Sequence, residues 1–155
     1  MTATIVHTCL ISSQKTAIVI DDDPDVLDAL SELFEIKQIR VIGKGESGKE
    51  AVELYQTLSP ELIFLDVNMP DYDGSYALEN IRKINPNAHV IMITGNTPGQ
   101  ILERVKKMKP TAIFSKPVCV NKIIEFVNSL PVGDRALRLE PVLESNLQYH
   151  DAVLQ

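Results

Sequence analysis

The chain has 155 residues, of which 45% are hydrophobic and 23% charged, and its formal net charge is −6 at pH 7. This length accommodates one globular domain with short tails. The acidic balance argues against nucleic acid as a partner, because surfaces that bind it usually carry an excess of basic residues. The apolar runs are too short to enter a membrane and the N-terminus carries no secretory signal pattern, so we expect a cytoplasmic protein with Cys9 and Cys119 reduced.

Five short apolar runs, rich in β-branched residues, recur along the chain at 17–20, 39–42, 62–65, 90–93 and 112–114. Apart from Arg40 they are apolar at every position, as expected for parallel strands that helices cover on both faces. Each run is followed by a segment with apolar residues at helical spacing. The predicted inward stripes are Val26, Leu27, Leu30, Leu33 and Phe34; Ala51, Val52, Tyr55 and Leu58; Ala77, Leu78, Ile81 and Ile84; Ile101, Leu102, Val105 and Met108; and Ile123, Ile124, Val127 and Leu130.

Caps and turns support these boundaries. Asp23–Pro24 and Thr97–Pro98 are typical of helix starts, and Pro131 ends the last helix. Asp71 and Asp73 favour a turn with Gly74 before the third helix. Strand–helix alternation over residues 16–130 therefore predicts a doubly wound α/β fold with right-handed crossovers.

Two tails lie outside this domain, an N-terminal extension at 1–15 and a C-terminal tail or linker at 131–155. Two interpretations of the second tail remain open. It is either a loosely docked extension or a short helix that binds a partner or a second copy through Leu143, Leu147 and Leu154.

Polar residues gather at the predicted carboxyl ends of the strands, where ligands bind in an open α/β sheet. Asp21 and Asp22 follow the first run, and Asp66, Thr94 and Lys116 follow the third, fourth and fifth. Carboxylates this close repel each other unless a cation lies among them. Mg²⁺ suits the site, because it is commonly held by one or two carboxylates, water and a phosphate oxygen, whereas no EF-hand spacing for Ca²⁺ is present.

This combination predicts phosphoryl chemistry. A carboxylate beside Mg²⁺ acts as a nucleophile toward phosphorus and gives an aspartyl phosphate. A lysine ammonium and a threonine hydroxyl then pair with the remaining phosphoryl oxygens.

The segment GKGESGKE at 43–50 offers an alternative, because it nearly matches a P-loop between a strand and a helix. The match fails at Glu50, which stands where a Ser or Thr hydroxyl should hold Mg²⁺. We therefore expect no nucleotide-hydrolysing P-loop.

Four motifs lie at these strand ends: Asp21-Asp22, the segment DVNMPDYDG at 66–74, Thr94-Gly95 and Lys116-Pro117. Together they resemble the receiver domain of two-component response regulators, including single-domain chemotaxis regulators. The resemblance covers about residues 16–130. It implies a flavodoxin-like, five-stranded parallel sheet in the order 2-1-3-4-5 with five helices, and a cis Lys116–Pro117 bond.

Transferred position by position, the resemblance assigns a metal site and a phospho-acceptor. Asp66 matches the acceptor and also a Mg²⁺ ligand. Asp22 matches the direct metal ligand, and Asp21 the acid that holds metal through water. Asn68 offers its backbone carbonyl to the metal, and with Asn96 it occupies the two positions that tune hydrolysis of the phosphoryl group in the family.

The same resemblance completes the set of catalytic residues. Lys116 matches the lysine that pairs first with the acceptor and then with the phosphoryl group, and Thr94 matches the hydroxyl that moves toward it. One position departs from the pattern, because Ile113 stands where the family often has an aromatic ring that moves with the threonine. The usual coupling between threonine and ring is therefore in question.

The implied function is that of a signalling switch that catalyses its own phosphorylation and dephosphorylation. A histidine kinase or histidine phosphotransfer protein donates the phosphoryl group, and a protein target reads the face of helix four, strand five and helix five. Homodimer formation stays open. The alternatives are a phosphate-independent interaction module with this fold and a hydrolase of small phosphorylated metabolites, and Asn68 stands where the latter enzymes generally have a second acid.

Overall fold

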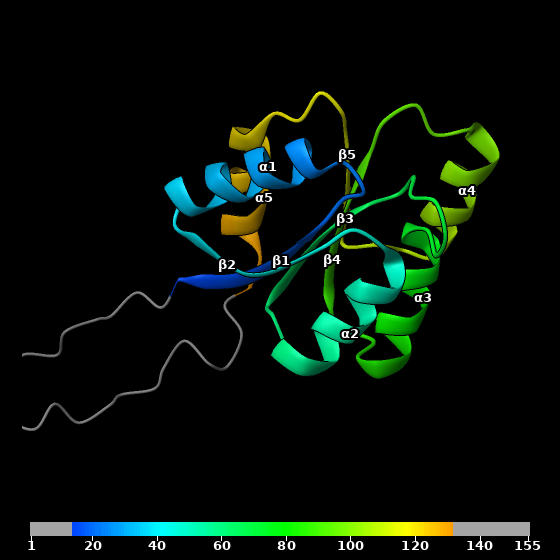
Figure 1. The fold of residues 1–155 in the computed structure, drawn as a ribbon, viewed down its shortest axis with the longest axis horizontal. Coiled ribbons are helices and arrows are strands. Elements are labelled where there is room, and N and C mark those ends of the chain that lie inside the picture. The colour runs from blue at the N-terminus through cyan, green and yellow to red at the C-terminus, as the bar shows by residue number, and fades with distance from the viewer. Residues whose placement is uncertain (1–13, 132–155) are drawn as a thin grey trace, which may run out of the picture. The chain divides into compact units, whose positions relative to one another are not determined.

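The computed structural model describes residues 14–131 (Figure 1). The predictions made for most of the two tails, including the leucine spacing at 143–154, lie outside these residues. Within the described part of the chain, no helix is long and apolar enough to cross a membrane.

Strands and helices alternate five times, as predicted. The elements are β1 (Lys15–Ile20), α1 (Pro24–Ile36), β2 (Ile39–Gly45), α2 (Gly48–Leu58), β3 (Leu62–Asp66), α3 (Gly74–Ile84), β4 (His89–Thr94), α4 (Gly99–Lys107), β5 (Ala112–Ser115) and α5 (Val120–Ser129). All strand pairs are parallel and the sheet order is β2-β1-β3-β4-β5, which confirms the predicted fold class. The strand order reverses between β1 and β3, and in open α/β sheets ligands bind outside the carboxyl ends of the strands at such a point.

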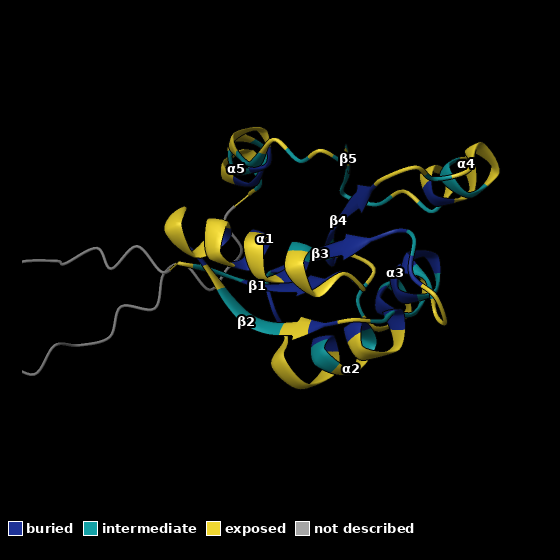
Figure 2. Cartoon of the chain, turned by 45° about the horizontal axis from the view of Figure 1, so that its top comes forward, coloured by how far each residue is buried: buried dark blue, intermediate teal, exposed yellow. Residues whose placement is uncertain are grey.

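Two apolar layers enclose the sheet. Helices α1 and α5 lie on one face of the sheet, and α2, α3 and α4 lie on the other (Figure 1). Their buried apolar side chains form one core layer on each face. The central strands β1, β3 and β4 are largely buried, whereas the outward faces of α1 and α2 are exposed (Figure 2). On the α1 side, the rings of Phe34 and Phe64 stack with centroids 4.1 Å apart. The rigid centre of the sheet therefore carries the residues that follow β1 and β3.

Three of the predicted inward positions are wrong. Leu33 is 40% exposed, because at 100° per residue it lies at the edge of the buried stripe that is centred on Leu30 and Phe34. Leu58 and Ile84 are the last residues of α2 and α3, and both are exposed at their helix ends.

The cap predicted at Asp23 is present, and Asp73, which was predicted to form a turn, caps the third helix. Asp23 accepts hydrogen bonds from the backbone N–H groups of Asp25 and Val26 at the start of α1, and Asp73 accepts one from Tyr76 at the start of α3. Such caps satisfy N–H groups that have no partner within the helix. Both helices therefore begin at fixed points next to the carboxyl edge of the sheet.

Candidate acidic site at the carboxyl edge of the sheet

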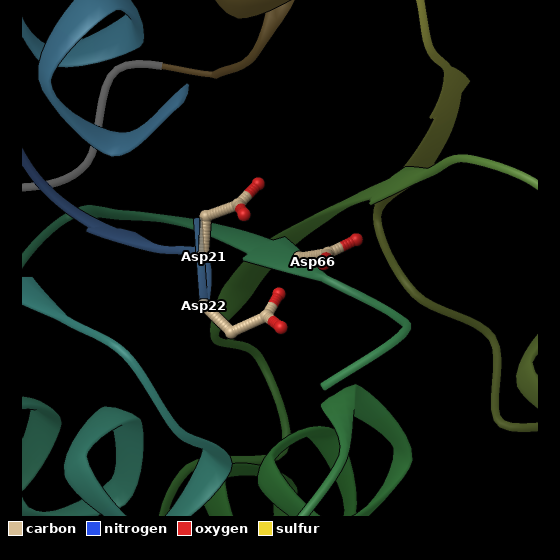
Figure 3. A group of neighbouring side chains, drawn as sticks. All are labelled: Asp21, Asp22 and Asp66. Atoms are coloured by element: carbon tan, nitrogen blue, oxygen red, sulfur yellow. The ribbon is translucent and has the colours of Figure 1, made fainter. Parts of the chain in front are cut away.

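Three carboxylates meet where the sheet order reverses. Asp21 and Asp22 directly follow β1, and Asp66 is the last residue of β3, which pairs with β1. One carboxylate oxygen of each lies within 4.8 Å of the others, and the three side chains point to the same side of the strand ends (Figure 3). Asp21 and Asp66 are buried, while Asp22 is exposed. The structure thus brings together the three acids that were predicted to hold a metal.

Lys116 reaches this cluster from the loop after β5. Its Nζ lies 2.8 Å from Asp21 Oδ2 and 3.6 Å from Asp66 Oδ1. The nearer partner is therefore Asp21, whereas the resemblance implied the acceptor Asp66. Partial burial works to lower the pKa of Lys116, but its hydrogen bond to Asp21 and the charges of Asp66 and Asp21 outweigh burial and raise the pKa above its ordinary value. The ammonium stays charged, and the Lys116–Pro117 bond that follows it is cis.

Asp66 is the member of the cluster with an oxygen that accepts no hydrogen bond from the residues that the structure describes. Its Oδ1 is buried and has no hydrogen-bond partner. Burial raises the pKa of Asp66 from 3.8 to about 6, with Lys116 opposing the rise and Asp21 adding to it. A buried carboxylate oxygen without a donor, next to two further acids, is suited to a hard cation that takes oxygen ligands. The residues present therefore fit Mg²⁺.

Two glycines allow the loop after β3 to lie close to neighbouring backbone. A Cβ on Gly74 would lie 2.3 Å from the backbone oxygen of Asp66, so this close approach requires glycine. The N–H of Gly48 donates to the carbonyl of Tyr72 at 2.7 Å, which ties the start of α2 to the same loop. Asp71 and Tyr72 both have positive φ, at 49° and 61°. This loop is therefore held by the close contact at Gly74 and by the hydrogen bond at Tyr72.

A second hydroxyl accompanies Thr94. Thr97 was predicted as part of the start of α4, but the N-cap is Pro98, and the Thr97 hydroxyl bonds to the Thr94 hydroxyl instead. The Asn68 side-chain amide donates to Thr97 Oγ1 at 2.9 Å. Sequence reasoning missed this link, and the only available signal was a second threonine in the loop that follows β4.

The segment that resembled a P-loop has a different structure. Gly43, Lys44 and Gly45 continue β2 instead of forming a phosphate-binding loop. The Glu50 carboxylate accepts a hydrogen bond from the N–H of Glu46 at 3.1 Å, while Ser47 accepts one from the N–H of Glu50. This reciprocal capping starts α2 and occupies the helix end that a P-loop would offer to phosphate.

Ile113 and Phe114 lie on opposite faces of β5. Ile113 packs against the layer that contains α4, whereas Phe114 packs against the α1 and α5 layer and meets Phe126 edge-to-face at 5.9 Å. Phe114 therefore does not replace the ring that the family often has at the position of Ile113.

Comparisons with known proteins agree with this geometry. The family model of the response regulator receiver domain matches residues 17–128. Chemotaxis protein CheY of Thermotoga maritima is 28% identical over 117 residues, which cover 75% of this chain and 97% of that protein. The protein-glutamate methylesterase/protein-glutamine glutaminase of Methanococcoides burtonii is 35% identical over 123 residues, which cover 77% of this chain and 35% of that longer protein.

Solved structures show the same likeness. A chain of the CheX–CheY–BeF₃–Mg²⁺ complex from Borrelia burgdorferi matches with a TM-score of 0.68 at 26% identity, and the match covers 74% of this chain and 87% of that one. The CheY-like receiver domain protein of Methanospirillum hungatei matches with a TM-score of 0.69 at 24% identity, over 75% of this chain and 92% of that chain.

A parallel sheet in the order 2-1-3-4-5, with clustered acids and a lysine at its carboxyl edge, defines the CheY-like class of α/β proteins. The chain belongs to the response regulator receiver domain family.

Proposed function

We propose that this chain is a phosphorylation-dependent switch in two-component signalling, with Asp66 as the acceptor of the phosphoryl group. The observation that carries the proposal is the buried Oδ1 of Asp66, which has no hydrogen-bond partner although Asp21, Asp22 and Lys116 surround it. The Asp66 carboxylate thus lies among two further acids and an ammonium, the groups that a metal-assisted phosphoryl transfer uses. We take residues 16–130 as the receiver domain, and the match to the family model at 17–128 supports this range.

The donor is a phosphohistidine on a histidine kinase or a histidine phosphotransfer protein. An Asp66 carboxylate oxygen attacks the phosphorus in line, so that a P–O bond forms while the P–N bond breaks and its electron pair stays on the imidazole. Asp22, Asp66 and the backbone carbonyl of Asn68 would hold Mg²⁺ directly and Asp21 would hold it through water, and the bound ion would supply positive charge to balance that of the phosphoryl group. The same centre later releases the phosphoryl group to water.

Lys116 and Thr94 act on the other phosphoryl oxygens. The Lys116 ammonium already lies between Asp21 and Asp66, so it needs only a small movement to pair with a phosphoryl oxygen on Asp66. Thr94 is the last residue of β4, the strand next to β3, and its hydroxyl is a hydrogen-bond donor for another oxygen. Their movement shifts the surface of α4, β5 and α5 between two populations that a partner protein distinguishes.

Phosphoramidate tests this proposal because it donates through a P–N bond. The ³¹P NMR spectrum of the protein with Mg²⁺ and phosphoramidate should show an acyl phosphate resonance in the wild type and in Asp71→Asn, a control at an exposed acid of the same loop. The resonance should be missing in Asp66→Asn. An equal resonance in Asp66→Asn would assign the acceptor elsewhere, and no resonance in any of the proteins would favour the phosphate-independent module.

A further inference from the structure

A chain of hydrogen bonds joins the end of β3 to the end of β4. The Asn68 amide donates to Thr97 Oγ1 at 2.9 Å, and Thr97 Oγ1 in turn bonds to Thr94 Oγ1. Thr94 Oγ1 lies 3.4 Å from the carbonyl oxygen of Gly95. A single direction of donation satisfies the whole chain, from the amide to Thr97, from Thr97 to Thr94 and from Thr94 to Gly95. The Thr94 hydroxyl thus has both a donor and an acceptor within its own loop.

These partners compete with the phosphoryl group. Thr94 is 6% exposed, so its hydroxyl does not exchange partners freely with water. Among the residues that the structure describes, Thr94 Oγ1 has hydrogen bonds only with Thr97 and Gly95. The Thr94 hydroxyl has one proton, which goes to Gly95 in this direction of donation. To donate to an oxygen on phosphorylated Asp66, the Thr94 hydroxyl must therefore give up Gly95 and turn away from the position in which it accepts from Thr97. The hydrogen bonds of the resting Thr94 hydroxyl and its hydrogen bond to a phosphoryl oxygen are therefore mutually exclusive.

Thr97 also stands at the entry to α4. Its N–H donates to the carbonyl of Gly95 at 2.8 Å, and the N-cap Pro98 makes no side-chain hydrogen bond. The helix therefore has no side-chain cap at its N-cap, and the residue before the N-cap, Thr97, is bonded to Asn68 and Thr94.

We propose that Thr97 is a positioning residue that holds the Thr94 hydroxyl in the resting rotamer and connects its release to the start of α4. This inference rests on the proposed function, because the competitor for Thr94 is the phosphoryl group on Asp66. The physical consequence is direct, since stabilising the resting state weakens the apparent affinity for any ligand that needs the other state.

The first arm of the test uses the protein without phosphoryl ligands. Three-bond couplings from the Thr94 methyl carbon to the backbone N and carbonyl carbon report its χ1 rotamer. A single rotamer is expected in the wild type and in Thr97→Ser, and rotamer averaging in Thr97→Val and Thr97→Ala. Thr57→Val is the matched control, because it removes an exposed hydroxyl on α2. A single Thr94 rotamer in both hydroxyl-free Thr97 variants would overturn the inference.

The second arm measures the affinity for beryllofluoride, a mimic of the phosphoryl group, in excess Mg²⁺ from the amide shifts of Gly95. Loss of the Thr97 hydroxyl should tighten binding about fivefold, which corresponds to the net contribution of one hydrogen bond, about 1 kcal/mol. Thr97→Ser and Thr57→Val should bind as the wild type does. Unchanged or weaker binding in both Thr97→Val and Thr97→Ala, with their fold verified by far-UV circular dichroism, would contradict the inference.

The two arms separate this inference from the function on which it rests. If wild-type protein binds no beryllofluoride, the proposed function fails, while the couplings in the free protein still decide whether Thr97 fixes Thr94. If the wild type binds the mimic and the couplings do not change in the variants, only the role of Thr97 fails.

Discussion

The substitution Asp66→Asn should stabilise the metal-free protein at neutral pH. The wild type must bury an ionised carboxylate, and burial raises the pKa of Asp66 from 3.8 to about 6. At about 1.4 kcal/mol for each pH unit between these two values, the ionised form costs folding about 3 kcal/mol. Asparagine carries no charge and avoids this cost. The free energy of unfolding should therefore rise by about 2–3 kcal/mol at pH 7.5.

The pH dependence of this gain has a definite sign. Between pH 3.8 and about 6 the folded wild type binds more protons than the unfolded chain, so its stability falls as the pH rises. The cost of ionised Asp66 is absent below pH 3.8 and complete above about pH 6. At pH 5, about midway between the two pKa values, the advantage of Asp66→Asn should shrink to roughly half of its value at pH 7.5.

Urea unfolding with a chelator, followed by far-UV circular dichroism, measures both values, since the chain contains no tryptophan for fluorescence. Asp71→Asn is the control, because it removes an exposed carboxylate at a positive φ that asparagine tolerates. Added Mg²⁺ should narrow the difference, since binding to the native wild type stabilises it. No gain at pH 7.5, or a gain that grows toward pH 5, would refute the idea that burial of ionised Asp66 destabilises the fold.

Three further predictions test other parts of the account. Gly74→Ala places a methyl group 2.3 Å from the backbone oxygen of Asp66 and should lower the free energy of unfolding by more than about 2 kcal/mol. The control Gly99→Ala, whose added methyl group has no atom within 4 Å, should leave the free energy of unfolding unchanged or higher. Equal effects of the two substitutions in urea unfolding would contradict this prediction. Phe34→Ala removes the ring stacked in the core and should cost about 3–5 kcal/mol by the same measurement, and a loss under about 1 kcal/mol would be inconsistent with its complete burial. Asp21→Asn should weaken Mg²⁺ binding about 10–100-fold in calorimetric titration, and an unchanged affinity would remove Asp21 from the metal site.

The strands were predictable because apolar runs of β-branched residues mark buried parallel strands. Their lengths were not. The predicted second run ended at residue 42, but β2 continues to Gly45 because Ile18, Val19 and Ile20 pair with its last three residues. Pairing with a central strand overrides the weak strand preference of glycine and lysine.

The acidic site was predictable from position alone, because Asp21, Asp22 and Asp66 each lie next to a strand end that topology places at one edge. Its internal contacts were not. Lys116 Nζ lies 2.8 Å from Asp21 and 3.6 Å from Asp66, and no sequence pattern indicates which of the two acids is nearer. Thr97 bonds to Asn68 across 29 positions of sequence, and no local pattern indicates a contact of that range.

The central claim is that Asp66 accepts a phosphoryl group in a reaction that needs Mg²⁺. The most direct test is the intact mass of the protein after incubation with acetyl phosphate, with Mg²⁺ or with a chelator, for the wild type, Asp66→Asn and Asp71→Asn. The account predicts the mass of one added phosphoryl group only with Mg²⁺, in the wild type and in Asp71→Asn. An adduct that forms without Mg²⁺ or persists in Asp66→Asn would contradict it, as would the absence of both an adduct and beryllofluoride binding in the wild type.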